Sequence, residues 1–251
     1  MILYQEYAPC PPLSPYLACL WTCQAQPDGA VLSHRVLPDN CIDILWQDTD
    51  PQGGVAGMTS SAIHVPFARP VRTIAVRFKP GAAAHFFDLP LHELIDLHPC
   101  LPDLWGTGQA AQFADALWSR PLSDIEAIAV LERLMLTRLQ AGKQRCTLVE
   151  HALQALQASR GSLRIDSLAD TLGVSRQHLA SQFRARVGLN AKLFARVCRF
   201  QHATTRLKDI HPGRVDMAAI ALDLGFYDQP HMIHEFRALS GSSPQSFTAK
   251  A

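Results

Sequence analysis

The spacing of apolar and polar residues divides the chain into two unlike parts. Over roughly the first hundred residues, short runs of β-branched and aromatic residues alternate with clusters of Pro, Gly, Asp and Asn such as the DPQGG stretch. This pattern is typical of strands joined by turns. Strands are expected over residues 2–7, 18–25, 33–38, 41–47, 62–67 and 73–78. Their number and spacing predict a small barrel or sandwich.

After residue 80 the spacing of apolar residues becomes helical. Short helices are expected within 82–87 and 89–97, and longer ones over 109–118 and 123–140. Ser123, followed by Glu126 three residues later, forms a capping box at the start of the last helix. Its broad apolar stripe consists of Ile125, Ile128, Leu131, Met135 and Leu139. Such a stripe packs either against the N-terminal domain or against a second copy of the chain. The sequence allows both interpretations. Residues 141–143 are expected to end this helix.

One motif occurs twice between Leu168 and Phe247, at residues 168–188 and 220–241. The second copy contains one extra residue, placed between its turn glycine and the start of its second helix. With that residue allowed for, the matched pairs are Ala169 and Ala221, Leu172 and Leu224, Gly173 and Gly225, Ser175 and Asp228, His178 and His231, Phe183 and Phe236, and Gly188 and Gly241. A pattern repeated at this spacing indicates two copies of one supersecondary unit.

Each copy predicts a helix-turn-helix. The small alanine allows a second helix to approach closely, and the glycine suits a left-handed position at the end of the first helix. Ser175 or Asp228 then caps the second helix through its side-chain oxygen. A further helix over 148–156 should precede the first copy, and a helix from about Asn190 to Leu207 should separate the two copies.

Charge is distributed unevenly along the 251 residues. From Thr147 onward there are 13 Lys and Arg against 8 Asp and Glu, whereas the preceding part has 10 against 14, for an overall net charge of +1. A basic C-terminal part fits a DNA-binding module joined to a regulatory one. No apolar run is long enough to cross a membrane, and no signal-peptide pattern begins the chain. The seven irregularly spaced cysteines fit reduced thiols, so a cytoplasmic protein is expected.

Residues 147–251 resemble the DNA-binding domain of AraC/XylS-type transcription regulators. The resemblance rests on Ile220-Ala221, Gly225-Phe226, Asp228, Phe236-Arg237, Gly241, Ser243-Pro244 and Phe247, and on a linker-helix stretch from Arg199 to Leu207. Ala191, Ser181 and Pro230 depart from the family's usual residues. The resemblance implies a sequence-specific DNA-binding regulator with double-stranded DNA and RNA polymerase as partners. It also implies that two reading helices enter successive major grooves.

The resemblance, together with the exposed faces of the two second helices, gives a set of candidate DNA-binding residues. Base-reading positions fall on Gln177, Ser181, Gln229, His231 and His234. Candidate phosphate contacts are Arg176, Arg184, Arg196, Arg199 and Arg237, with Ser175 at the helix cap. Glutamine can form two hydrogen bonds with adenine. Histidine titrates near neutrality, so His231 and His234 are also candidates for pH-dependent binding. Arg199 has an alternative interpretation, in which it stabilises the linker helix and does not contact DNA.

The first hundred residues resemble the cupin-like N-terminal domain that a subset of AraC-type regulators carries. The similar strings are HRVLPDNCIDILW, GMT and VRFKPGAA. The predicted fold class is therefore a mainly β N-terminal domain with added helices, followed by an all-α domain with tandem helix-turn-helix motifs. The predicted domains are 1–120 for regulation, 121–146 for a helix and linker with a candidate dimer contact, and 147–251 for DNA binding. A small-molecule effector acting on the first domain follows from the resemblance.

The sequence offers little for catalysis. His34, His64, His85, His92 and His98 are scattered singly, and no nucleophile, phosphate-loop or dinucleotide motif is present. We therefore expect no enzyme, catalytic residue, metal site or cofactor. The alternative function is a zinc- or redox-dependent sensor, or a DNA alkyl acceptor, that acts through Cys10, Cys19, Cys23 and Cys41. The spacing lacks a C-x-x-C pair, and buried cysteine commonly serves as a small apolar residue, so ordinary packing is favoured.

Overall fold

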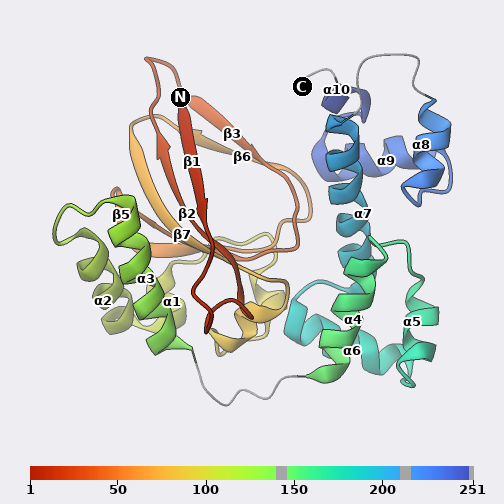
Figure 1. Ribbon diagram of the computed structural model, residues 1–251, viewed down its shortest axis with the longest axis horizontal. Helices are drawn as coiled ribbons and strands as arrows, with labels where there is room; N and C mark the ends of the chain where they lie inside the picture. The colour runs from red at the N-terminus through yellow and green to blue at the C-terminus, as the bar shows by residue number, and fades with distance from the viewer. Residues whose placement is uncertain (140–145, 210–215, 249–251) are drawn as a thin grey trace.

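The computed structural model describes residues 1–139, 146–209 and 216–248. A β-rich N-terminal part is followed by a helical C-terminal part, which confirms the predicted fold class (Figure 1). The helical part is arranged along one long helix, α7 (Ala191–Lys208). Within the described residues, no helix is both long and apolar enough to span a membrane.

Within the part of the chain that the structure describes, seven strands form two antiparallel sheets. They are β1 (Ile2–Tyr7), β2 (Leu17–Ala25), β3 (Leu32–Val36), β4 (Asp43–Gln47), β5 (Asp50–Ala56), β6 (Ile63–Phe67) and β7 (Val71–Phe78). A five-stranded sheet has the order β1-β2-β7-β4-β5, and β3 pairs with β6 in a separate two-stranded sheet. Six of the seven strands coincide with predicted ones to within two residues.

The strand β5 was missed because its DPQGG stretch was interpreted as a turn. A β-carbon added at Gly53 would lie 2.8 Å from the Trp46 ring, and the φ angle of Gly53 is +81°. The glycine therefore allows β5 to pass close over a buried tryptophan of β4. Glycine within a strand often marks such a close backbone approach, and the pairing register of β4 and β5 shifts between Leu45 and Gln47.

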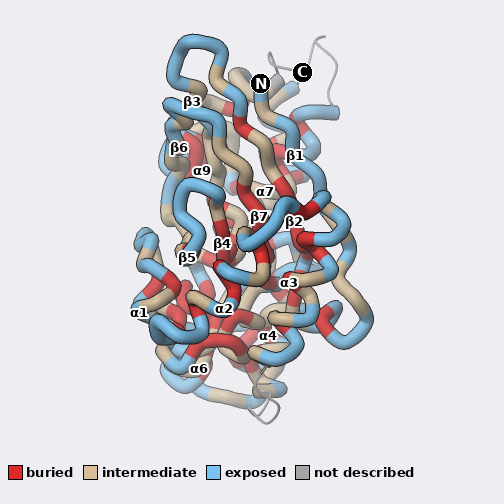
Figure 2. Tube along the Cα trace, turned by 90° about the vertical axis from the view of Figure 1, so that its left-hand side faces the viewer, coloured by how far each residue is buried: buried red, intermediate tan, exposed pale blue. Residues whose placement is uncertain are grey.

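Helices cover one face of the larger sheet. The short 3₁₀ helices η1 (Ala82–His85) and η2 (Leu91–Leu94) precede α1 (Leu101–Trp105), α2 (Thr107–Trp118) and α3 (Asp124–Arg138). Trp46 stacks on Phe113 of α2 with ring centroids 5.4 Å apart. Buried residues follow β2, β7 and β4 and continue into these helices (Figure 2).

The predicted capping box at Ser123 and Glu126 is present. Most of the apolar stripe of α3 is covered within the chain, since Ile128, Leu131 and Met135 are buried. Ile125, at 75% exposure, faces outward. The homodimer contact therefore stays a prediction that concerns only the outward part of α3. The predicted helix end at 141–143 lies outside the described residues.

The C-terminal part contains α4 (Thr147–Ala158), α5 (Ile165–Thr171), α6 (Arg176–Val187), α7, α8 (Met217–Asp223), α9 (Gln229–Ser240) and α10 (Gln245–Thr248). In Figure 1, α4, α5 and α6 surround one end of α7, and α8, α9 and α10 surround the other. The predicted helices around 148–156 and 190–207 are thus confirmed.

Candidate nucleic-acid interface

The first helix-turn-helix consists of α5 and α6. Gly173 has a φ angle of +66°, the left-handed conformation that the sequence predicts for the turn. The Ser175 side chain accepts a hydrogen bond from the backbone N–H of His178, with a donor–acceptor distance of 3.2 Å. Leu179 and Phe183 are fully buried on the inner face of α6. Because these two residues bury the inner face of α6, its opposite face lies toward solvent.

The second helix-turn-helix, formed by α8 and α9, follows the same plan. Gly225 has a φ angle of +78°. Asp228 caps α9 by accepting from the backbone N–H of His231 at 2.7 Å. Met232 and Phe236 are fully buried. Pro230 lies in the first turn of α9, where the missing N–H costs no helical hydrogen bond.

The helix α7 joins both motifs. Its cap, Asn190, accepts from the backbone N–H of Leu193 at 2.8 Å. Phe194 of α7 contacts Phe183 of the first motif with ring centroids 5.5 Å apart. Phe200, further along the helix, contacts Phe236 of the second motif at 5.0 Å. One helix thus carries an aromatic anchor for each motif.

The candidate residues of α6 lie together on one exposed surface. Arg176, Gln177, Ser181 and Arg184 are all exposed, as is the cap residue Ser175. Arg176 forms an ion pair with Asp166 at 3.0 Å, but both side chains are at least half exposed. A pair this accessible contributes little to stability, so the guanidinium can exchange its partner for a phosphate.

The candidate DNA-binding residues of α9 differ more in their solvent exposure. His234 and Arg237 are exposed, whereas Gln229 and His231 are only partly so. His231 Nδ1 accepts the backbone N–H of Tyr227 at 3.1 Å, and its ring meets Phe226 edge-on at 5.7 Å. The geometry therefore supports a structural role for His231 in the turn that precedes α9.

Two of the arginines predicted to contact phosphate form hydrogen bonds within the protein instead. Arg196 Nε donates to Glu235 Oε2 at 2.7 Å, and the Glu235 side chain is 11% exposed. Arg199 Nη1 donates to the carbonyl oxygen of Gly225 at 2.9 Å, and its guanidinium lies over the Phe226 ring. Burial lowers the pKa of Arg199. These contacts favour the bracing role for Arg199 and suggest the same role for Arg196.

Tyr227 is an exposed aromatic side chain in this surface that was not among the candidates. It is 83% exposed and immediately precedes the cap of α9. The available signal was the extra residue in the second copy of the motif, which falls on this position.

The cysteines of the alternative function lie in the N-terminal domain, outside the helix-turn-helix motifs. Cys19 and Cys23 share one face of β2, as predicted, where they pack with Trp21 and Leu45. Burial raises the pKa of the Cys19 thiol to about 11 and also raises the pKa of Cys41 well above its ordinary value. Among the described residues, no three His, Cys, Asp or Glu side chains come together as metal ligands would. This geometry favours protonated, packed thiols over a zinc or alkyl-acceptor site.

Comparison with known proteins bears on both parts of the chain. Residues 168–250 match the family model of a helix-turn-helix domain, and residues 5–99 match a model described as a domain of unknown function. No curated protein matches the sequence.

Among solved structures, ToxT from Vibrio cholerae is similar at 10% identity and a TM-score of 0.45, with 99% of this chain and 98% of that chain covered. An unsaturated fatty acid-bound ToxT structure is similar at 12% identity and a TM-score of 0.41, with 98% and 94% covered. The family-model match and the two equivalent motifs joined by α7 show that the C-terminal part of the chain is a helix-turn-helix domain.

Proposed function

We propose that this chain is a non-enzymatic, sequence-specific transcription regulator that places α6 and α9 in successive major grooves of double-stranded DNA. The observation that carries the proposal is the pair of equivalent motifs held by α7. With 18 residues, α7 is roughly 27 Å long at 1.5 Å per residue. Adjacent major grooves on one face of the duplex repeat at about 34 Å. A linker of this length suits two reading helices about one helical turn apart.

The experiment is a selection of bound duplexes from a randomised pool, performed with the parent and with Gln177→Ala and Gln229→Ala. Each variant should relax base preference at one or two base pairs, and the two affected positions should lie about one helical turn apart. Gln52→Ala, at an exposed glutamine of β5, is the control. Unchanged preference in both variants would mean that these glutamines position the protein without reading the sequence.

The proposal includes control of DNA binding through the N-terminal domain. The first motif and the N-terminal domain share one continuous hydrophobic core. Asn40 Nδ2, from the segment before β4, donates to the carbonyl oxygen of Phe194 at 3.1 Å and so connects that domain to α7. Because these contacts reach the first motif directly, a change in the N-terminal domain has a physical route to α6.

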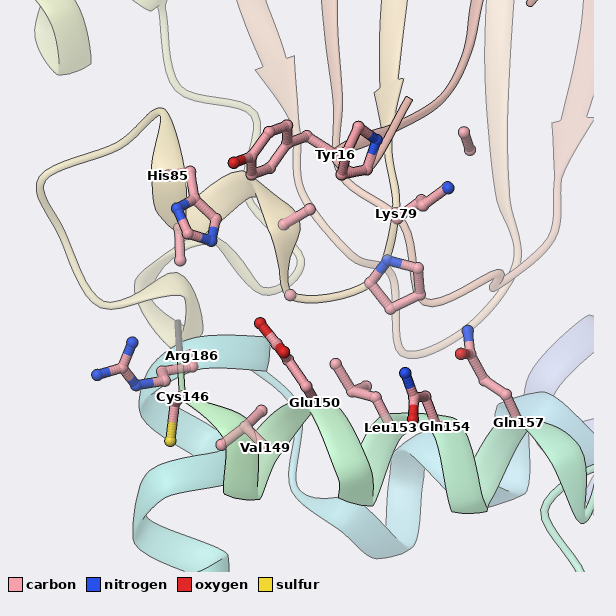
Figure 3. Close-up of a pocket in the computed structure, with 16 residues that line it drawn as sticks. Tyr16, Lys79, His85, Cys146, Val149, Glu150, Leu153, Gln154, Gln157 and Arg186 are labelled. Carbon is pink, nitrogen blue, oxygen red and sulfur yellow. The ribbon is translucent and has the colours of Figure 1, made fainter. Parts of the chain in front are cut away.

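A cleft of about 550 Å³ lies on this route, between the N-terminal domain and α4. Figure 3 shows Tyr16 and Lys79 on one side and Glu150 and Leu153 of α4 on the other. A molecule bound there would touch both parts at once and would stabilise the arrangement that fits it best. We place the small-molecule effector in this cleft.

Leu153→Trp, which fills the cleft, tests this placement. It should change affinity for the selected duplex by more than about threefold if the cleft is coupled to binding, because coupling energies are typically about 1–3 kcal/mol. Thr147→Trp, at an exposed position of the same helix outside the cleft lining, is the control. An affinity equal to the parent's in a folded Leu153 variant would remove the cleft from the regulatory route. Homodimerisation through the outward side of α3 and contact with RNA polymerase remain parts of the proposal.

A further inference from the structure

The turn of the second motif is one residue longer than that of the first, and the hydrogen bonds identify that residue. After the turn glycine, Val174 donates its backbone N–H to the carbonyl of Ala169 at 3.1 Å. Phe226 does the same to Ala221 at 2.9 Å. In the first motif the helix cap follows at once. In the second motif Tyr227 stands between Phe226 and the cap, so Tyr227 is the inserted residue.

The backbone of Tyr227 is fixed although its side chain is exposed. Its N–H is bound to His231 Nδ1, and the preceding Phe226 is buried in the core of the second motif. The tyrosine side chain itself is 83% exposed, so packing within the chain does not explain it. Its position is at the amino end of α9. In helix-turn-helix proteins, the amino-terminal residues of the second helix are those that meet the DNA.

We propose that Tyr227 is a DNA contact that the second motif has and the first lacks. Its phenol hydroxyl donates to a phosphate oxygen while its ring lies against the neighbouring sugar. Tyrosine is among the side chains that commonly bind phosphate, and such contacts fix register and orientation without reading bases. The inference rests on the proposed DNA binding of α9.

The charges of the two motifs are consistent with this role. On α6, both Arg176 and Arg184 are exposed as candidate phosphate contacts. Around α9, Arg237 is exposed, but Arg196 and Arg199 are held within the protein. The second motif therefore presents fewer of the arginines predicted to contact phosphate. The uncharged hydroxyl of Tyr227 would add one further phosphate contact to it.

The test measures affinity for a duplex selected by the parent protein, using Tyr227→Phe and Tyr227→Ala. Tyr227→Phe should weaken binding by about tenfold, which corresponds to one hydrogen bond to a charged group. Tyr227→Ala should weaken it further because the ring contact is lost as well. The salt dependence should not change, because tyrosine neutralises no phosphate charge. Base preference should also stay as in the parent.

Tyr4→Phe, at another exposed tyrosine, is the matched control and should bind like the parent. Wild-type affinity in Tyr227→Phe would overturn the phosphate contact, and altered preference at a base pair would overturn the positioning role. Thermal unfolding of each variant separates lost contact from lost fold, and the Phe variant keeps the test valid if the Ala variant unfolds. If the parent selected no duplex at all, the proposed function itself would fail.

Discussion

The two helix-turn-helix motifs are built alike but are held to the rest of the molecule differently. The core of the first motif is continuous with that of the N-terminal domain. A β-carbon at Gly188, just after α6, would lie 2.9 Å from the carbonyl oxygen of Leu91 in η2. Among the described residues, the second motif has its own core, and from the N-terminal domain only Leu37 packs against it. The same local sequence rules therefore produce one motif fused to the regulatory domain and one attached mainly through α7.

Polar contacts complete the attachment of the second motif. The Arg35 guanidinium donates to the carbonyl oxygen of Ser240 and lies 5.4 Å from the Phe247 ring centre. The backbone N–H of Ala62 donates to the carbonyl oxygen of Leu239 at 2.8 Å. Because such contacts contribute less than an apolar core, the second motif should be the more easily displaced of the two. A regulatory change would then alter the relative placement of α6 and α9.

The largest expected effect comes from removing the aromatic centre of either core. Phe183→Ala and Phe236→Ala should each cost about 3–5 kcal/mol. Phe183→Ala should lower the unfolding midpoint of the N-terminal domain along with that of the first motif. Phe236→Ala should melt the second motif while the N-terminal domain keeps its parent midpoint. Calorimetry together with tryptophan fluorescence checks this, because all four tryptophans precede α4.

One cooperative transition shifted equally by both substitutions would contradict this difference. Val31→Ala, which truncates an exposed side chain before β3, should leave both midpoints near those of the parent.

Replacing the turn glycines by valine should have a somewhat smaller effect on stability. Gly225→Val should destabilise the second motif and abolish detectable operator binding, because a β-branched residue resists a positive φ angle. Near Gly225, an added β-carbon would also lie 3.2 Å from the Ser162 side chain, whereas at Gly173 it would meet nothing within 4 Å. Gly173→Val should therefore be the milder change. Duplex binding, together with circular dichroism of the folded N-terminal domain, tests the pair, and full-strength binding by Gly225→Val would contradict the argument.

Features set by local chemistry were predictable from the sequence, and features set by tertiary contacts were not. Caps at Ser123, Ser175 and Asp228 and the left-handed turn glycines follow from rules that span three or four residues. The strand β5 was missed because its glycines resemble a turn until Trp46 is placed beneath them. No local rule indicates that Gly188 touches η2 or that Arg196 faces Glu235. The reading-helix face was predictable from periodicity, but the partial burial of His231 depended on the exact path of the turn.

Arginines that brace the protein should be separable from arginines that contact DNA. Arg196→Ala leaves the buried Glu235 without its partner and should cost about 1–3 kcal/mol of stability in the second motif. It should leave the slope of log affinity against log salt unchanged. Arg184→Ala, at an exposed position of α6, should instead reduce that slope by about one with little loss of stability. Salt titrations of binding and thermal melts of both variants check this, and a reduced slope for Arg196→Ala would return it to the phosphate contacts.

The smallest expected effect concerns the attachment of the second motif to β3. Arg35→Ala removes the hydrogen bond to the carbonyl of Ser240 and the contact with Phe247, which together should contribute about 1 kcal/mol. Amide hydrogen exchange should become faster at the C-terminal end of α9, where that carbonyl lies, while exchange in α6 stays as in the parent. Arg69→Ala, at an exposed arginine after β6, is the matched control. Because the first motif is held by a shared apolar core, equal acceleration in α6 and α9 would mean that the two motifs are attached to the N-terminal domain as a single unit.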